Sequence, residues 1–149
     1  GQGIRPRFIV VDYLQLIVSK GQDRVREVGN ISRGLKQMAR DWDCPVLALS
    51  QLSRGPEGRA DHRPMLSDLR DSGDIEQDAD VILFLYRDEY YFPDTEKKNC
   101  AELNIAKQRN GPTGTIALTW MPRSTTFRSA AGFHETKEKP PKEWVQEHL

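Results

Sequence analysis

The amino-acid sequence predicts an α/β fold in which a mostly parallel sheet, flanked by helices, is extended by an antiparallel C-terminal hairpin. Residues 8–11 (FIVV) and 46–49 (VLAL) are apolar at every position, which favours strands buried on both faces. Strand, helix and strand in this order predict two parallel strands joined by a right-handed crossover. The helix between them is indicated by apolar residues at steps of three and four: Val25, Val28, Ile31, Leu35, Met38 and Trp42.

The second half of the chain predicts one more buried strand and then antiparallel structure. Residues 80–86 (DVILFLY) form a third apolar run. Residues 101–106 and 115–120 alternate well enough to be two antiparallel strands, and the turn-forming stretch NGPTG at 110–114 lies between them. Parallel strands are therefore expected first, followed by a hairpin at the end of the sheet.

The remaining segments are expected to connect these elements. Residues 52–74 are rich in glycine, proline and charge, which predicts a long loop with a short helix near residues 65–70. Residues 87–99 are expected to form a polar connection. Two adjacent prolines and mixed charge predict a flexible tail at residues 132–149, which leaves residues 1–131 as the folded domain.

The composition fits one globular domain and excludes several classes of protein. The chain has 149 residues, 37% hydrophobic and 30% charged, and its 22 basic side chains equal its 22 acidic ones. This balance does not indicate a basic nucleic-acid-binding protein. A chain of neutral net charge can still bind nucleic acid if its positive charge is confined to one channel. Cys44 and Cys100 have no metal-ligand spacing. With no apolar run of membrane-spanning length and no signal-peptide pattern, a reducing, cytoplasmic location is expected.

The first candidate motif is FIVVD at residues 8–12, an apolar strand that ends in an aspartate. In P-loop NTPases such an aspartate holds the magnesium ion beside the phosphates, at the carboxyl end of its strand. Asp12 is therefore a candidate metal residue. Taken alone, the motif is more often a strand followed by an aspartate-capped turn.

The second candidate is Ser50-Gln51, at the end of the neighbouring predicted strand. A neutral amide at this position could hydrogen-bond a γ-phosphate and lose that partner after hydrolysis. The alternative is that a polar residue simply ends a buried strand.

The third candidate is the basic pair Lys107 and Arg109 at the predicted hairpin tip. Side chains two residues apart on a strand point to the same face, so the pair could form a cationic prong that reaches a neighbouring molecule. A solvated hairpin end is the alternative.

The fourth candidate is the long loop at 52–74. Four arginines and several glycines there suit phosphate contacts, but five acidic residues accompany them, so a mixed-charge surface loop is an equal alternative. The arginines are Arg54, Arg59, Arg63 and Arg70, and the acidic residues are Glu57, Asp61, Asp68, Asp71 and Asp74.

Six stretches in a fixed order distinguish between these alternatives. Together they closely resemble the DnaB family of hexameric replicative helicases over roughly residues 8–127, and the SDLRDSGDIEQDAD segment separates that family from RecA-type recombinases, the runner-up. The stretches are VDYLQL (11–16), ISRGLKQMAR (31–40), ALSQLSR (48–54), RPMLSDLRDSGDIEQDAD (63–80), LYRDEYY (85–91) and AKQRNGPTG (106–114).

The resemblance implies a RecA-like P-loop NTPase core with ATP and Mg²⁺ bound between the subunits of a ring. Asp12 matches the Walker B aspartate, which is associated with Mg²⁺ through water. Gln51 matches the glutamine that senses the γ-phosphate. Lys107 and Arg109 match the basic pair donated in trans to the neighbouring subunit's ATP, with Arg109 as the arginine finger.

The resemblance also implies binding partners. Arg70, Asp71 and Gly73 match the loop that follows the backbone of single-stranded DNA, although the family commonly has Glu where Asp71 stands. A homo-hexamer, a primase and a helicase loader are the other implied partners, and the tail at 132–149 is a candidate segment for the last two.

One family motif is absent from these 149 residues. No G-x-x-x-x-G-K-[ST] stretch occurs, and no glycine is followed directly by lysine. We therefore expect the phosphate-binding loop and the strand with the catalytic glutamate to lie upstream, and this chain to be inactive alone. A sheet with part of its edge and faces uncovered should also be less stable or self-associate. A module that binds DNA or helicase subunits without hydrolysis is the alternative function.

Overall fold

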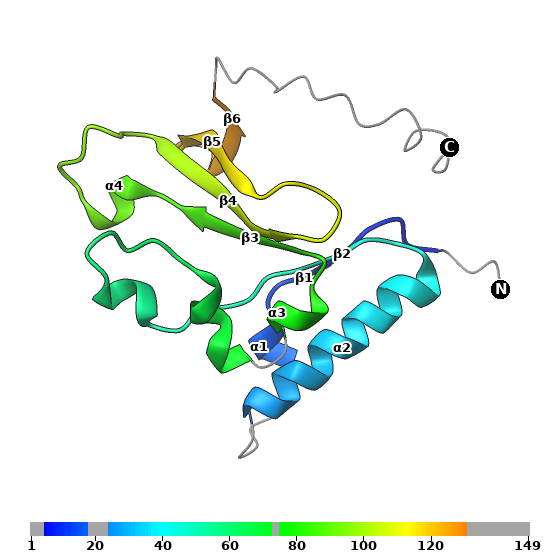
Figure 1. Ribbon diagram of the computed structural model, residues 1–149. Helices are drawn as coiled ribbons and strands as arrows, with labels where there is room; N and C mark the ends of the chain where they lie inside the picture. The colour runs from blue at the N-terminus through cyan, green and yellow to red at the C-terminus, as the bar shows by residue number, and fades with distance from the viewer. Residues whose placement is uncertain (1–4, 18–23, 73–74, 131–149) are drawn as a thin grey trace.

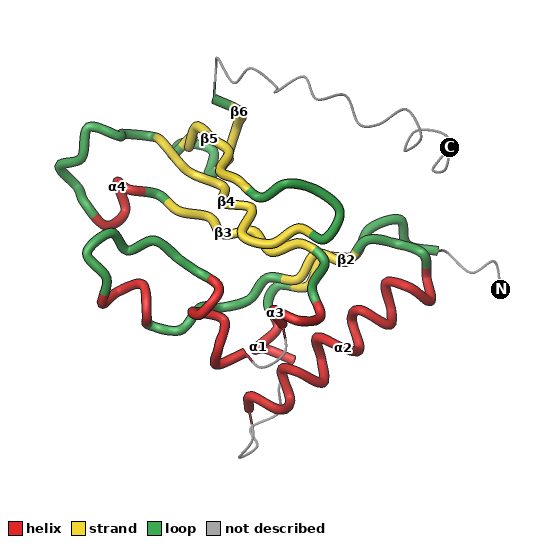
Figure 2. The backbone as a smooth tube through the Cα atoms, viewed as in Figure 1, coloured by secondary structure: helices red, strands yellow, loops and turns green. Residues whose placement is uncertain are grey.

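The computed structural model describes residues 5–17, 24–72 and 75–130 and contains two sheets, one parallel and one antiparallel (Figures 1 and 2). The parallel pair consists of β1 (Ile9–Val11) and β2 (Val46–Ala48), with Ile9 opposite Val46 and Val11 opposite Ala48. Figure 1 draws this pair between a long helix and the antiparallel sheet. The predicted α/β class is confirmed.

Two helices connect β1 to β2. The first, α1 (Leu14–Ile17), was not predicted, and the second, α2 (Arg24–Trp42), is the expected amphipathic helix. After α2 the chain reverses through Asp43, whose positive φ of 49° places it in the left-handed region. The N–H of Cys44 then donates to Ala39 O at 3.1 Å, and that of Asp43 to Arg40 O at 3.3 Å, the bond pattern of a Schellman ending.

The core lies between these helices and the third strand. Val28 of α2 and Leu14 of α1 are almost fully buried and pack with four residues from later in the chain, namely Leu69, Ile75, Ile82 and Phe84. Ile31 and Leu35 pack against this cluster, so the middle of the predicted apolar stripe is its core-facing part. The two ends of the stripe, Val25 and Trp42, are about half exposed.

The antiparallel sheet has four strands in sequential order: β3 (Val81–Tyr86), β4 (Cys100–Gln108), β5 (Gly114–Met121) and β6 (Thr126–Ser129). The predicted hairpin is therefore confirmed as β4 and β5. The third apolar run differs from the expectation, because β3 pairs antiparallel with β4 rather than extending a parallel sheet. β6 was not predicted.

The expectation that the apolar strands are buried on both faces was wrong. In β3, burial alternates, with Phe84 4% exposed and Leu85 48% exposed. Val10 of β1 and Leu47 of β2 are also about half exposed. Within the described ranges, helices pack against the Phe84 face of β3, while the opposite face is open to solvent.

The long loop is partly helical. It contains a short 3₁₀ helix, η1 (Gly55–Gly58), and a longer one, η2 (Leu66–Ser72), which confirms the helix expected near residues 65–70. A single turn, α3 (Ile75–Asp78), leads into β3, and another, α4 (Asp88–Tyr91), begins the predicted polar connection.

Cys44 is buried and Cys100 is exposed, and both are free thiols. Neither a membrane-length apolar helix nor a group of metal-ligating side chains is found in the part of the chain that the structure describes. The predicted tail at residues 132–149 lies outside that part.

Candidate functional site

The carboxyl ends of β1 and β2 bring two predicted site residues to one edge of the parallel pair. Asp12 directly follows β1, and Gln51 lies three residues after β2. Backbone bonds continue beyond the strands, because the N–H of Leu49 donates to Val11 O and that of Leu14 donates to Leu49 O, both at 2.9 Å. Asp12 and Gln51 are both exposed at this edge.

A third residue, Gln15 of α1, holds the segment that contains Gln51. Its side-chain Oε1 accepts the backbone N–H of Gln51 at 3.1 Å. Its Nε2 donates to Ser50 Oγ at 3.0 Å and to Gln51 O at 3.3 Å. Gln15 was not predicted as a site residue, although it lies in the VDYLQL stretch. These bonds fix the backbone at Gln51 and leave its amide side chain exposed.

The basic pair docks on the end of α3 instead of extending freely from the hairpin tip. Lys107 Nζ donates to the carbonyls of Glu76 and Gln77, at 2.5 and 3.4 Å. Arg109 Nη2 donates to the same Gln77 carbonyl at 2.6 Å. The two cations therefore lie on one side of the hairpin, and that side faces α3.

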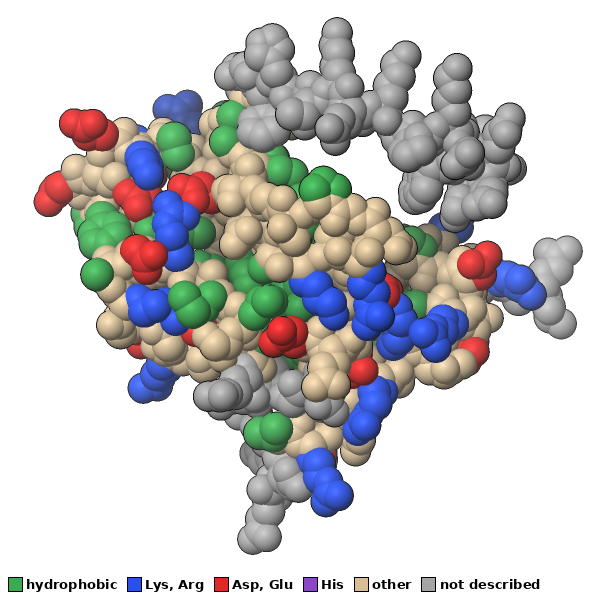
Figure 3. Space-filling view, in the orientation of Figure 1, with side chains coloured by type: hydrophobic (Ala, Val, Ile, Leu, Met, Phe, Trp, Pro, Cys, Tyr) green, Lys and Arg blue, Asp and Glu red, His purple; other side chains and the backbone are tan. Residues whose placement is uncertain are grey.

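Asp80, directly before β3, holds Arg109 at two further points. The Arg109 backbone N–H donates to Asp80 O at 3.0 Å, and Arg109 Nε lies 3.4 Å from Asp80 Oδ1. Lys36 of α2 forms an ion pair with the same carboxylate. The Lys36 ammonium holds the pKa of Asp80 below its usual range, with smaller contributions from Arg109 and Arg40. Figure 3 shows Lys and Arg side chains gathered on this side of the molecule.

The predicted DNA-contacting residues lie at the end of η2. Arg70 and Asp71 belong to this 3₁₀ helix, but their side chains and the whole of Gly73 lie outside the described residues. Among the residues that precede them in η2, Asp68 is 3% exposed.

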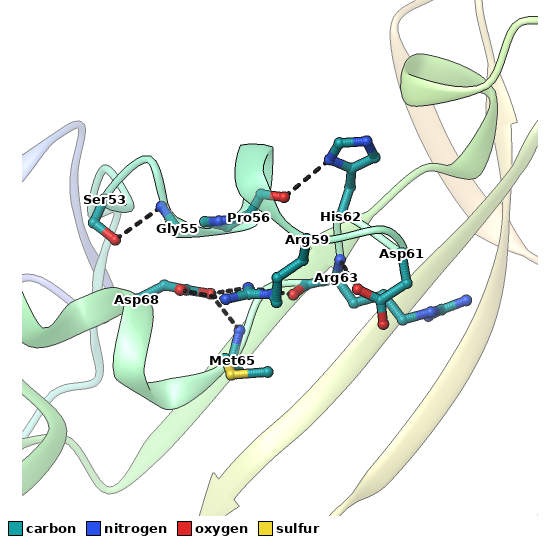
Figure 4. Close-up of polar contacts among 9 residues, drawn as sticks. All are labelled: Ser53, Gly55, Pro56, Arg59, Asp61, His62, Arg63, Met65 and Asp68. Carbon is teal, nitrogen blue, oxygen red and sulfur yellow. Dashed lines mark hydrogen bonds and ion pairs between the residues drawn. The ribbon is translucent and has the colours of Figure 1, made fainter.

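Asp68 anchors the loop from within (Figure 4). Its carboxylate accepts two bonds from the Arg59 guanidinium and one from the backbone N–H of Met65 at 2.8 Å, and Asp68 O accepts the N–H of Ser53 at 3.0 Å. Met65 is the residue before η2 and Asp68 is the third residue of η2, so the bond between them is one half of a capping box. Arg59 keeps the pKa of Asp68 below its usual range despite burial.

Arg63 makes a second internal pair, with Glu102 of β4, and its guanidinium lies 4.5 Å from the centre of the Tyr86 ring. Burial and the Asp88 carboxylate raise the pKa of Tyr86 to about 12. Arg59 and Arg63 therefore stabilise the loop through acidic partners. The hypothesis that they offer free phosphate contacts is corrected on this point.

These internal pairs predict a loss of stability in acid. The pKa values of Asp68 and Glu102 are lowered by Arg59 and Arg63 respectively, so their contribution to stability is fully present above the unfolded pKa of about 4. It is lost as the pH falls through the lower folded pKa. Urea unfolding between pH 6 and pH 2.5 should show this decline, and Asp68→Asn should flatten it. Asp94→Asn, at an exposed position, is the control, and an equal flattening there would contradict the assignment.

The fold and the edge described above define an α/β domain whose candidate ligand-binding residues lie at the carboxyl ends of parallel strands. Residues 3–129 match the family described as DnaB-like helicase C terminal domain. The Replicative DNA helicase DnaB of Geobacillus stearothermophilus is 52% identical over 136 residues, covering 89% of this chain and 30% of that protein. The Replicative DNA helicase DnaC of Bacillus subtilis is 57% identical over 122 residues, covering 80% and 27%.

Two solved structures have the same fold. One is described as an ATPase domain, with a TM-score of 0.78 and 50% identity, covering 83% of this chain and 44% of that one. The other is a DnaB-like replicative helicase whose description includes its interactions with primase, with the same score and identity, covering 83% and 30%. The chain belongs to the DnaB-like helicase C-terminal domain family. It spans about 30% of the length of the two curated relatives.

Proposed function

We propose that this chain is the C-terminal part of the motor domain of a replicative DNA helicase, which translocates on single-stranded DNA as a ring and unwinds the duplex by hydrolysing ATP. The observation that supports this most directly is the placement of Asp12 and Gln51 at neighbouring carboxyl ends of the parallel pair. An acid and a neutral amide at that edge are the groups that a P-loop NTPase needs on the strands beside its phosphates.

In this proposal the two residues have different roles. The Asp12 carboxylate is exposed and suits a magnesium ion held through water, because Mg²⁺ prefers oxygen ligands and keeps much of its hydration shell. When bound, the ion neutralises charge on the phosphates. The exposed Gln51 amide hydrogen-bonds the γ-phosphate, and Gln15 keeps its backbone in place.

The basic pair acts on a second nucleotide. Lys107 and Arg109, held on α3, are placed at the ATP of the neighbouring subunit, with Arg109 as the finger that stabilises transition-state charge. The ring is a homo-hexamer, so that each nucleotide has residues from two subunits. Primase and a helicase loader are further proposed partners, and the proposed location is the cytoplasm, at the replication fork.

Arg70, Asp71 and Gly73 are proposed to follow the DNA backbone. Contacts to phosphate contain no base information. Arg70→Ala in the complete helicase should therefore weaken binding about equally for every single-stranded sequence. It should also lower the salt slope of log K by roughly 0.7, which corresponds to one phosphate contact.

Fluorescence anisotropy with poly-dT and mixed oligonucleotides at several salt concentrations measures both quantities. Arg54→Ala, in the same loop but outside the proposed contact, is the matched control. Unchanged affinity and slope in Arg70→Ala would remove this segment from the DNA path.

The function as a whole is tested by comparing the complete protein with this chain. The complete protein should unwind a labelled forked duplex only with ATP and Mg²⁺. The 149-residue chain should release no phosphate from ATP above a protein-free control, because it contains no phosphate-binding loop. ATP-independent strand separation by the complete protein, or turnover by the chain alone, would overturn the proposal.

A further inference from the structure

The contact of Lys107 and Arg109 with α3 connects the proposed arginine finger with the segment that is proposed to bind DNA. α3 begins at Ile75, two residues after Gly73, and the carbonyls of its residues Glu76 and Gln77 accept bonds from Lys107 and Arg109. The segment proposed to bind DNA is thus followed directly by the helical turn on which the proposed finger rests.

That turn is anchored in the core. Ile75 is 8% exposed and belongs to the same buried cluster as Leu69 of η2, so α3 and η2 are packed together on both sides of the DNA segment. Contact between these apolar side chains would transmit a displacement of η2 to α3. The carbonyl groups of Glu76 and Gln77, and with them the basic pair, would then move with α3.

The guanidinium of Arg109 is bound along one edge only. Nη2 reaches Gln77 O and Nε reaches Asp80 Oδ1, so the inner edge of the planar fork is fixed at two points. Among the described residues, Nη1 has no hydrogen-bond partner. The Arg109 side chain is about half exposed, so Nη1 is available to an oxygen of a neighbouring molecule.

We infer that Asp80 is a positioning residue for ATP hydrolysis: with the Gln77 carbonyl it holds Arg109 on α3, so that the helical turn following the DNA segment sets the position of the finger. This inference rests on the proposed function, because it takes Arg109 as the finger and residues 70–73 as the DNA contact. It goes further by naming the residue that orients the finger and the element that links DNA binding to hydrolysis.

The test is Asp80→Asn in the complete hexameric helicase, assayed at saturating single-stranded DNA. Misplacing a catalytic group by about 1 Å can cost up to roughly 10²-fold in rate, so we expect kcat to fall by about ten- to a hundredfold. The KM for ATP and the affinity for poly-dT should not change, because the inferred role of Asp80 acts through Arg109 and involves no contact with either ligand. A loss confined to kcat distinguishes positioning from a general loss of structure.

Lys36→Gln is the matched control, because it removes the other ion pair of Asp80 and leaves Arg109 in place. Its kcat should stay close to that of the unmodified helicase. Unchanged or increased kcat in Asp80→Asn would overturn the inference, and an increase would mean that Asp80 restrains the finger.

If Asp80→Asn does not assemble into a hexamer, Asp80→Glu is the variant that tests the inference. Glutamate can still pair with the flexible Lys36 but moves its carboxylate relative to Arg109, so kcat should fall, and an unchanged kcat would overturn the inference.

A double-mutant cycle separates this inference from the function on which it rests. If Asp80 acts through Arg109, then Asp80→Asn should have no further effect on kcat in an Arg109→Ala background. An equal loss in both backgrounds would assign Asp80 another role and overturn the inference. If Arg109→Ala itself retains full turnover, the finger assignment fails. If Arg109→Ala is inactive while Asp80→Asn is fully active, the finger stands and only the inference fails.

Discussion

Arg109→Ala in the complete helicase is expected to lower the kcat of DNA-stimulated ATP hydrolysis by roughly 10³-fold or more. An arginine finger interacts with charge that develops in the transition state, so its loss affects turnover and leaves ground-state nucleotide binding largely intact. Arg109 is about half exposed and lies outside the buried cluster, so its removal should not unfold the domain. Steady-state phosphate release measures the effect.

The control for this experiment is Arg128→Ala, which removes an exposed arginine of β6 on the opposite edge of the antiparallel sheet. Its turnover should be unchanged. Hexamer formation by both variants is followed by light scattering. Loss of the hexamer together with turnover in Arg109→Ala would assign the residue a structural role at the subunit interface.

Phe84→Ala is expected to destabilise this chain by about 3–5 kcal/mol, the usual cost of removing a buried aromatic side chain and leaving a cavity. Phe84 is 4% exposed and packs in the cluster formed by α1, α2, η2 and α3. Since domains of this size are stable by only about 5–15 kcal/mol, the variant should be close to unfolding. Urea denaturation followed by circular dichroism measures the change.

Leu85→Ala is the matched control because it lies on the same strand with its side chain on the open face, 48% exposed. Its cost should be below about 1 kcal/mol, since little apolar area is lost. Equal destabilisation by the two substitutions would mean that the Leu85 face is covered in solution, for instance by a second copy of the chain.

The parts of the fold that the sequence predicted are those in which a periodic pattern extends over several residues. The apolar stripe of α2 spans five turns, and the β4–β5 hairpin has turn residues between two alternating strands, so local chemistry alone determines both. The single turns α1, α3 and α4 have four residues each, which is too short for a helical period to be recognised.

For the apolar strands, the sequence could not show which face is buried. A run such as VILFLY is apolar at every position, which is compatible with one covered face or with two. Only the tertiary structure shows that Phe84 faces the helices and that Leu85 does not.

The candidate site was predicted in its order along the chain but not in its internal contacts. Asp12 and Gln51 follow apolar runs, so their placement at strand ends could be derived from the pattern. The ion pair of Arg63 with Glu102 joins residues 39 positions apart, and the bonds of Gln15 to Gln51 span 36. No local pattern indicates such distant partners. The sequence therefore could not show which arginines of the loop pair with acidic residues of the same chain and which remain available to bind another molecule.

The order of the antiparallel strands has a consequence for how the chain is made. Among the described residues, the strands from β3 to β6 pair with their neighbours in sequence, and the connections from β4 to β5 and from β5 to β6 are short loops that close at low entropic cost. During synthesis, β1, α1, α2 and β2 leave the ribosome before β3, which supplies Ile82 and Phe84 to the cluster that contains Leu14 and Val28. The buried cluster on which these helices pack is therefore complete only after β3 has emerged.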